Sequence, residues 1–231
     1  MIGIIGAMAL EVERIRALLE QSERVAVGCT EFYTGKLHGV DAAVAVCGVG
    51  KVNAALCAQA MLLRFRPRLV INIGVAGGLS SAMRIGDLAV AESVVQYDFD
   101  TTPLGEPRGW ISYLESVYIP CDKNAVRALL NAAKGLEGIQ THAGVIATGD
   151  QFISSQATKD GLVKEFGAIA CEMEGAAVGQ VCALHKVPFG VVRAISDGAD
   201  DGSPVDFLTF ARQAADRSAA LLLAFIKEVS A

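Results

Sequence analysis

Short apolar runs rich in β-branched residues alternate along the chain with segments of helical periodicity. The apolar runs cover residues 2–5, 42–46, 69–73, 88–95, 144–147 and 189–195, and the helical patterns cover residues 51–64, 125–134, 175–185 and 207–227. Continuous apolar strands that alternate with helices are typical of a largely parallel sheet covered on both faces. The pattern predicts an α/β fold with a mixed, mostly parallel central sheet flanked by helices.

No internal repeat, low-complexity tract or Ser/Pro-rich linker interrupts this alternation. We therefore expect a single domain over residues 1–231. One segment, residues 99–120, shows no clear period and contains Pro103, Pro107 and Pro120. Loops of that length are usually functional or disordered.

Composition and charge narrow the range of partners. Of the 231 residues 52% are hydrophobic and 19% are charged, the formal net charge is −5, and Lys and Arg form no run. Because basic side chains at phosphates supply most of the affinity for nucleic acid, we expect no such partner. No apolar stretch reaches the roughly 18 residues that cross a bilayer, and the first residues predict a buried strand entering a helix rather than a signal peptide. We expect a soluble, cytoplasmic protein with no membrane partner.

The cysteines and histidines lack the spacing of a disulfide framework or a zinc site. They are Cys29, Cys47, Cys57, Cys121, Cys171, Cys182, His38, His142 and His185. Buried, reduced cysteines are the better interpretation for a cytosolic protein. Two glycine-rich turns also fail the tests for a nucleotide cofactor, because residues 3–8 lack the G-x-G-x-x-G spacing and Val52 follows Gly-Lys where a phosphate loop needs Ser or Thr. We expect neither metal nor cofactor.

Glycines and polar residues gather directly after the apolar runs. They occupy residues 6–11, 47–50, 74–78, 148–153 and 196–197. Ligands of open α/β sheets bind at the carboxyl ends of strands, so these segments predict one site. Gly74, Gly77 and Gly78 allow close approach of the backbone to a ligand, although they suit a tight strand-to-helix turn equally well.

Three carboxylic acids belong to these segments or to a strand–helix junction: Glu11, Glu174 and Asp197. Each alone also fits an ordinary role, on a helix surface, in an acidic first turn or as a helix cap. Glu172 precedes Glu174 by two residues, and residues two apart on a helix point to nearly opposite sides, so at most one of them is expected in a given site. Arg193 lies inside an apolar strand and needs an acidic partner, for which Glu11 is the candidate.

Together the three acids favour acid/base hydrolysis of a glycosidic bond. In that reaction one carboxylic acid protonates the leaving group, and one carboxylate activates water on the opposite face of the sugar. The sequence offers no nucleophilic triad or phosphate loop that would favour other chemistry.

Six motifs occur in order from residue 2 to about residue 225. They are Ile4-Ile-Gly-Ala-Met with Glu11 close behind, Gly48-Val-Gly-Lys, Gly74-x-Ala-Gly-Gly, Gly149-Asp-x-Phe-Ile, Glu172-Met-Glu and Val191-Val-Arg-Ala-Ile-Ser-Asp. This set resembles the 5′-methylthioadenosine/S-adenosylhomocysteine nucleosidases of the nucleoside phosphorylase superfamily. The resemblance implies a nucleoside phosphorylase-like fold and hydrolysis of these nucleosides to adenine and the 5-thio-substituted ribose.

The resemblance also implies residue roles. Glu11 is similar to the family base that activates water, with Arg193 in support, and Asp197 is similar to the acid that protonates adenine N7 with help from Ser196. The implied substrate-binding residues are Phe152 stacked on the purine, the Ile153 backbone at its Watson–Crick edge, Met173 and Glu174 at the ribose, and Met8, Val49 and Phe207 around the 5′-thio group. Thr101 and Leu104 of a neighbouring subunit are expected to complete that pocket, which implies a homodimer.

Two positions depart from the family pattern, because Ile73 and Val75 stand where the family commonly has Thr and Ser. Val75 stands where the family commonly has a hydroxyl residue, which removes a side-chain hydrogen bond near the catalytic acid but leaves the backbone groups available. We interpret this as tuning of rate or substrate preference. Three alternatives stay open: a phosphorylase, which the anionic Glu11 disfavours because it would repel phosphate; hydrolysis of a futalosine-type nucleoside; and a catalytically silent purine-binding protein.

Overall fold

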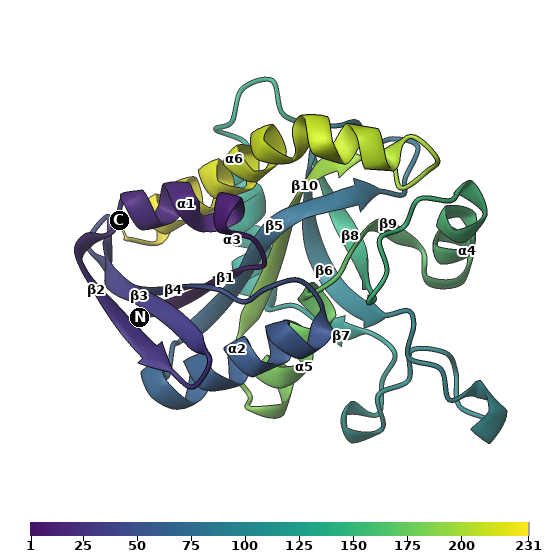
Figure 1. The fold of residues 1–231 in the computed structure, drawn as a ribbon, viewed down its shortest axis with the longest axis horizontal. Coiled ribbons are helices and arrows are strands. Elements are labelled where there is room, and N and C mark those ends of the chain that lie inside the picture. The colour runs from purple at the N-terminus through teal and green to yellow at the C-terminus, as the bar shows by residue number, and fades with distance from the viewer. Residues whose placement is uncertain (231) are drawn as a thin grey trace.

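A ten-stranded mixed sheet forms the centre of the computed structural model and carries helices on both faces (Figure 1). The structure describes residues 1–230, so Ala231, the last residue of the expected domain, lies outside the described part. The strands are β1 (Ile2–Gly6), β2 (Glu20–Val27), β3 (Thr30–Leu37), β4 (Val40–Val46), β5 (Leu69–Gly78), β6 (Leu88–Gln96), β7 (Ile119–Pro120), β8 (Thr141–Thr148), β9 (Ala168–Glu172) and β10 (Phe189–Asp197). The helices are α1 (Ala9–Ala17), α2 (Lys51–Phe65), α3 (Lys123–Ala133), α4 (Gln156–Phe166), α5 (Gly175–Leu184) and α6 (Ser203–Ser230), with two 3₁₀ turns, η1 (Thr102–Leu104) and η2 (Ser112–Leu114).

The sheet has two parts that share β5. In one part β5 pairs with β1, and the order continues through β4 and β3 to β2. In the other part β5 pairs with both β9 and β10, and the pairings β9–β8, β8–β6 and β6–β10 close a ring of strands. The pairings β4–β1–β5–β10 are parallel, as expected, whereas the β2–β3–β4 edge and the pairs that join β5 to β9 and β6 to β10 are antiparallel.

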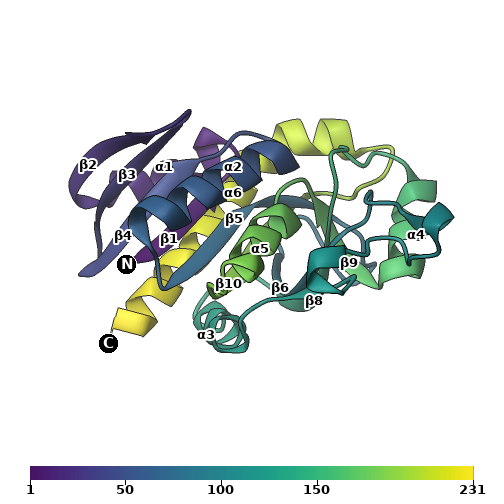
Figure 2. The same ribbon diagram turned by 90° about the horizontal axis from the view of Figure 1, so that it is seen from below.

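Two groups of helices bury the two faces of the sheet. Helices α1, α3 and α6 share one apolar cluster with the strands, including Ile15, Leu129 and Phe225. Helices α2 and α5 pack in a second cluster on the opposite side, and they lie side by side in the view from below (Figure 2). Helix α4 covers the end of the sheet beyond β9 (Figure 1).

All six apolar runs are strands, and the four helical patterns are helices, although α6 begins at Ser203, before the expected start at residue 207. The β2–β3 hairpin was not predicted, because the first residues of β2 are polar and exposed and carry no apolar alternation. Helix α4 and the short strand β9 were not assigned either. Residues 99–120 contain only η1 and η2 before the short strand β7, in agreement with the absence of periodicity there.

Candidate active site

The turns that follow β1, β4 and β8, together with the ends of β9 and β10, meet around one cavity of about 130 Å³. Its lining consists of Ala7, Met8, Glu11, Val49, Val75, Phe152, Glu172, Met173, Glu174, Ser196, Asp197 and Phe207. Most of the residues that the sequence nominated therefore come together. The two exceptions on the same chain, Ile153 and Arg193, are buried but do not line the cavity.

Glu11 is held by backbone donors from two strand ends. Its Oε2 accepts hydrogen bonds from the N–H groups of Ala7 at 2.7 Å and Met8 at 2.8 Å, and its Oε1 accepts one from Val75 N–H at 3.0 Å. Burial raises the pKa of Glu11, while the charge of Arg193 and these backbone hydrogen bonds oppose the rise. The side chain is thus fixed in orientation at a position where it can exchange a proton.

Glycines on β5 make room for the carboxylates. A Cβ at Gly74 would lie 2.5 Å from Glu11 Oε1, and one at Gly77 would lie 3.0 Å from Asp197 Oδ1. A side chain at either position would crowd the neighbouring carboxylate, so β5 requires glycine at both. The glycine run, which the sequence left between a ligand contact and a tight turn, serves instead to admit these two side chains.

Asp197 ends β10 and is 3% exposed. Its Oδ2 accepts a hydrogen bond from Ser196 Oγ at 2.8 Å, and its Oδ1 accepts one from Ala199 N–H at 3.0 Å. Ala199 has φ of +54°, a conformation that costs an alanine about 1 kcal/mol, so the turn after β10 is constrained to present its N–H to the carboxylate. The geometry assigns Asp197 a hydrogen-bonded position inside the cavity rather than the helix-cap role considered from the sequence.

Arg193 does not pair with Glu11, contrary to our expectation. Its guanidinium donates hydrogen bonds to Glu172 and, at 2.6 Å, to Asn72 Oδ1. Glu174 Oε2 lies 3.7 Å away and forms a second ion pair with it. The sequence argument failed because Glu172 was treated as part of a helix, whereas it is the last residue of β9 and points inward. The positive charge of Arg193 still opposes the rise in the pKa of Glu11.

Both acids of the Glu-Met-Glu run face the cavity, so the prediction that only one could enter was also wrong. Glu172 accepts hydrogen bonds from Thr148 Oγ1 and from the N–H groups of Glu174 at 2.9 Å and Gly175 at 2.7 Å. Glu174 Oε1 accepts one from Gly50 N–H at 2.9 Å. Burial, and then the charge of Glu172, raise the pKa of Glu174 to about 7.

The opposite wall of the cavity is apolar. The rings of Phe152 and Phe207 meet edge to face, with their centroids 5.6 Å apart. Phe152 and Val49 are each about half exposed, at 47% and 48%. They stand at the mouth, where an apolar ligand would cover them. Met8 and Met173 are partly buried beside them.

Thr101 and Leu104 lie outside this cavity. Thr101 precedes η1 and Leu104 ends it, on the segment that projects from the sheet in Figure 1, and Leu104 is 82% exposed. No lining residue of the cavity comes from this segment.

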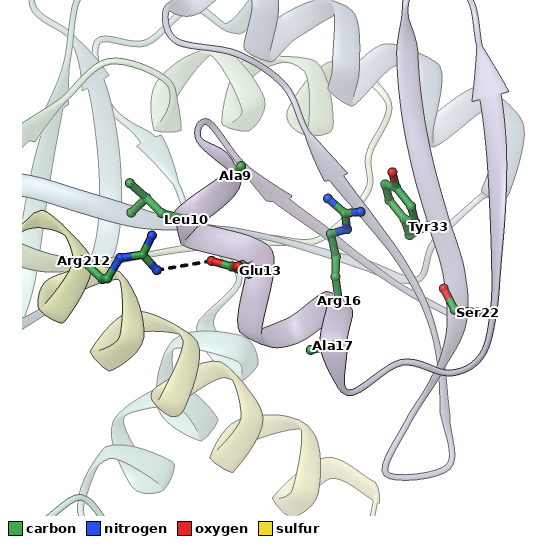
Figure 3. Close-up of a pocket in the computed structure, with 8 residues that line it drawn as sticks. All are labelled: Ala9, Leu10, Glu13, Arg16, Ala17, Ser22, Tyr33 and Arg212. Atoms are coloured by element: carbon green, nitrogen blue, oxygen red, sulfur yellow. Dashed lines mark hydrogen bonds and ion pairs between the residues drawn. The ribbon is translucent and has the colours of Figure 1, made fainter.

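A larger hollow of about 720 Å³ lies between α1, the β2–β3 hairpin and α6 (Figure 3). Its charged groups already have partners, since Glu13 pairs with Arg212 at 3.3 Å and the Arg16 guanidinium lies 3.6 Å from the centre of the Tyr33 ring. It contains none of the residues that the sequence nominated. The smaller cavity, with its buried acids, is the candidate active site.

Within residues 1–230, no group of three or more His, Cys, Asp or Glu side chains is arranged to hold a metal ion. All six cysteines are free thiols. In the same described range, no helix is long and apolar enough to cross a membrane.

Sequence reasoning missed the partners that hold the acids. Asn72 is fully buried, accepts from Arg193 and donates to the Ile5 carbonyl at 2.9 Å. Thr148 donates to Glu172 and accepts from Ala176 N–H at 2.8 Å. The lone amide of Asn72 within an otherwise apolar run was the available signal, since a buried amide needs partners.

Comparisons with known proteins agree with this geometry. Residues 1–227 match the family model of the phosphorylase superfamily. A 5′-methylthioadenosine/S-adenosylhomocysteine nucleosidase of Geobacillus thermodenitrificans is 41% identical over 228 residues, which cover 98% of this chain and 96% of that protein. The crystal structure of the corresponding nucleosidase from Neisseria meningitidis, in complex with methylthio-immucillin-A, superposes with a TM-score of 0.95 at 33% identity over 98% of each chain.

A futalosine hydrolase of Helicobacter pylori is also similar, with a TM-score of 0.94 at 37% identity over 98% of this chain and 97% of that one. Identity above 30% along nearly the full length of several nucleosidases exceeds what a shared fold alone requires. The chain belongs to the phosphorylase superfamily and, within it, to the family of the 5′-methylthioadenosine/S-adenosylhomocysteine nucleosidases.

Proposed function

We propose that the protein hydrolyses the N-glycosidic bond of 5′-methylthioadenosine and S-adenosylhomocysteine, releasing adenine and the 5-thio-substituted ribose. One observation carries the proposal: the carboxylates of Glu11, Glu174 and Asp197 converge, all buried, on a single cavity with an aromatic wall. That arrangement supplies acceptors and proton carriers for a sugar and a flat apolar surface for a base. The similarity to nucleosidases of this specificity supports it.

Asp197 is the general acid in this proposal. Adenine leaves readily only after N7 is protonated, so a proton passes from Asp197 to N7 as the bond between C1′ and N9 breaks. Ser196 holds the Asp197 carboxyl through their 2.8 Å hydrogen bond. Phe152 stacks on the purine, and the backbone of the neighbouring Ile153 binds its Watson–Crick edge.

Glu11 is the general base. A water molecule on the opposite face of the ribose gives a proton to Glu11, and its oxygen forms the new bond to C1′. Three backbone N–H groups fix the Glu11 carboxylate, and the nearby charge of Arg193 favours its ionised form before the reaction. Val75, which stands where the family commonly has a hydroxyl residue, still supplies one of these three donors through its backbone N–H.

Glu174 and Met173 bind the ribose. Glu174 uses one oxygen to accept from Gly50 N–H, so its other oxygen is available to the 2′ and 3′ hydroxyls. Hydrogen bonds to a carboxylate contribute roughly 1.5–3 kcal/mol each, which makes Glu174 the main determinant of ribose recognition.

The 5′-thio group occupies the apolar mouth formed by Met8, Val49 and Phe207, and Thr101 and Leu104 of a second copy cover it. The proposal of a homodimer rests on exposed apolar side chains: Leu104 at 82%, and Val52 and Leu56 on α2 at 71% and 53%. Sedimentation of the purified protein tests it, and replacement of Leu104 by Asp should shift the equilibrium toward monomer and raise KM.

We place the enzyme in the cytoplasm, where free thiols such as its six cysteines persist.

The position of Glu11 favours hydrolysis over phosphorolysis. The N–H groups of Ala7 and Met8 lie immediately before the first turn of α1, and the N-terminus of a helix is a ready anion site. The Glu11 carboxylate accepts from both of them, so phosphate would meet a negative charge where it needs donors.

The test is release of free base from a nucleoside panel, with and without phosphate. The panel contains methylthioadenosine, S-adenosylhomocysteine, adenosine and a futalosine-type nucleoside. We expect phosphate-independent release of adenine and the highest kcat/KM with the thio-substituted substrates. Strict dependence on phosphate would establish a phosphorylase, preference for the futalosine-type nucleoside would change the assigned substrate, and absence of release from every nucleoside would leave only purine binding.

A further inference from the structure

Lys51 joins three segments that are distant in sequence. Its backbone N–H, at the start of α2, donates to Asp150 Oδ1 at 2.8 Å, and its Nζ donates to Asp98 Oδ1 at 2.6 Å. Asp98 Oδ2 in turn accepts from Asp150 N–H at 2.8 Å. We call Lys51, Asp98 and Asp150 the Lys51 cluster. Every member contacts the other two, so the three chain segments are fixed relative to one another.

Each segment carries a part of the proposed substrate pocket. Val49, at the mouth of the cavity, stands two residues before Lys51, and between them Gly50 N–H donates to Glu174. Phe152 stands two residues after Asp150. Asp98 precedes η1, the segment of Thr101 that is proposed to reach a second copy. The cluster contacts neither Glu11 nor Asp197 through any hydrogen bond or ion pair in residues 1–230.

The turn before Lys51 needs this support. Gly50 has φ of +98°, and a Cβ there would lie 3.1 Å from Asp150 Oδ1, so Asp150 packs directly against the backbone of the turn. The Gly-Lys sequence that fails as a phosphate loop thus has another use. Its lysine does not line the cavity, and its ammonium group contacts Asp98, two residues after the end of β6.

Charge makes Lys51 the critical member. The cluster contains two carboxylates and one ammonium group, and the side chains of Lys51 and Asp98 are each only 18% exposed. Besides Asp98, the ammonium has Gln96 Oε1 at 3.2 Å. Without the ammonium, the Asp98 carboxylate would keep its hydrogen bond from Asp150 N–H but would be left partly buried with no cation, which is costly. The segment with Phe152 would then move away from β6 and from Val49.

We propose that Lys51 is a positioning residue for substrate binding: it holds the aromatic residue under the purine and the apolar residue at the 5′ group at the separation that the nucleoside requires. The identity of the substrate in this inference rests on the proposed function, whereas the contacts of the Lys51 cluster do not. Its action is on binding, because the acid and the base are held by other groups.

The test is the substitution Lys51→Met, which keeps the chain length and removes the charge. We expect KM for methylthioadenosine to rise at least about tenfold while kcat changes less than about threefold. This split is expected when the bound substrate and the transition state lose the same amount of binding energy. Adding Asp98→Asn to this variant removes the partly buried carboxylate that Lys51→Met leaves without a cation, and should recover a substantial part of the lost affinity. Lys36→Met is the matched control, because it breaks the exposed Lys36–Asp41 pair on the β3–β4 hairpin and should leave both constants unchanged.

Hydrogen–deuterium exchange of the peptide that spans residues 149–155 gives a readout without substrate. We expect faster exchange there in Lys51→Met than in wild type, with the unfolding midpoint lowered by no more than a few degrees. An unchanged KM together with unchanged exchange, a loss of kcat with no change in KM, or no recovery in the double variant would overturn the proposal. If wild type releases no base from any nucleoside, the proposed function fails, and the exchange experiment still decides the role of Lys51.

Discussion

Replacing Glu172 by Gln should lower the stability of the protein more than any isosteric change at an exposed acid. The substitution removes the charge that Arg193 pairs with, and Arg193 is 1% exposed. One oxygen of the Gln amide can still accept from the N–H groups of Glu174 and Gly175, and the amide nitrogen can donate to Thr148 Oγ1. The change therefore tests the ion pair while preserving most of the hydrogen bonds.

The magnitude follows from the surroundings. Breaking a buried ion pair by neutralising one partner costs about 3–5 kcal/mol. The lower end applies here, because Glu174 Oε2 is 3.7 Å from the guanidinium and Asn72 still accepts from it. In a chain of this length a loss of 1 kcal/mol in the free energy of unfolding lowers Tm by about 2–4 °C. The expected fall in Tm is therefore about 6–12 °C.

The assay is thermal unfolding followed by calorimetry at one fixed protein concentration, because association would also shift the midpoint. The matched control is Glu13→Gln, which neutralises the exposed partner of Arg212, where both side chains are more than two-thirds accessible at 67% and 72%. Exposed pairs contribute little, so the control should unfold at the wild-type temperature. If Glu172→Gln lowers Tm no more than the control does, the buried pair is not what holds β9 and β10 together.

Three further predictions concern the other acids. Glu11→Gln should reduce adenine release by several orders of magnitude while a non-hydrolysable substrate analogue still binds in calorimetric titration; turnover at the wild-type rate would remove its role as base. Asp197→Asn should lower kcat by about 10²–10⁴-fold for adenine nucleosides and less for a nucleoside with a better leaving group, and an equal loss for both would exclude general-acid catalysis. Because the pKa of Glu174 is raised from 4.5 to about 7 in the folded protein, the folded state binds the proton more tightly, and this stabilisation is complete below pH 4.5 and lost as the pH rises to about 7. Denaturant unfolding should therefore show wild type losing stability relative to Glu174→Gln across that window, and parallel pH profiles would contradict the raised pKa.

The apolar runs determine the centre of the fold well enough to be read from sequence. Strands such as β1, β5 and β10 are buried on both faces, so apolar residues run almost continuously along them and the pattern is clear. The β2–β3 hairpin escapes that reasoning because β2 is an edge strand whose first five residues are all exposed. The central strands could be predicted because they are buried, not because their residues have a high strand propensity.

The site was predictable as a set of residues but not as a set of contacts. Glu11, Glu174 and Asp197 follow or end the strands β1, β9 and β10 and meet at one cavity, even though β9 runs antiparallel to β5. The partner of Arg193 depended on whether Glu172 ended a strand or began a helix, and one residue of difference in that boundary decides which way its side chain points. The Lys51 cluster depends on the meeting of three turns, which no local pattern encodes.

Within residues 1–230, β5 is the only strand common to the closed ring and to the open extension of the sheet. Glu11 comes from the extension, through β1 and α1, whereas Asp197 comes from the ring, through β10. In the proposed mechanism the bond to be cleaved therefore lies across the boundary between these two parts of the sheet, with water activated on one side and the leaving group protonated on the other. On that mechanism, changes confined to the β1–α1 turn should alter which nucleophile attacks, while the half of the molecule that binds and protonates the base stays as it is.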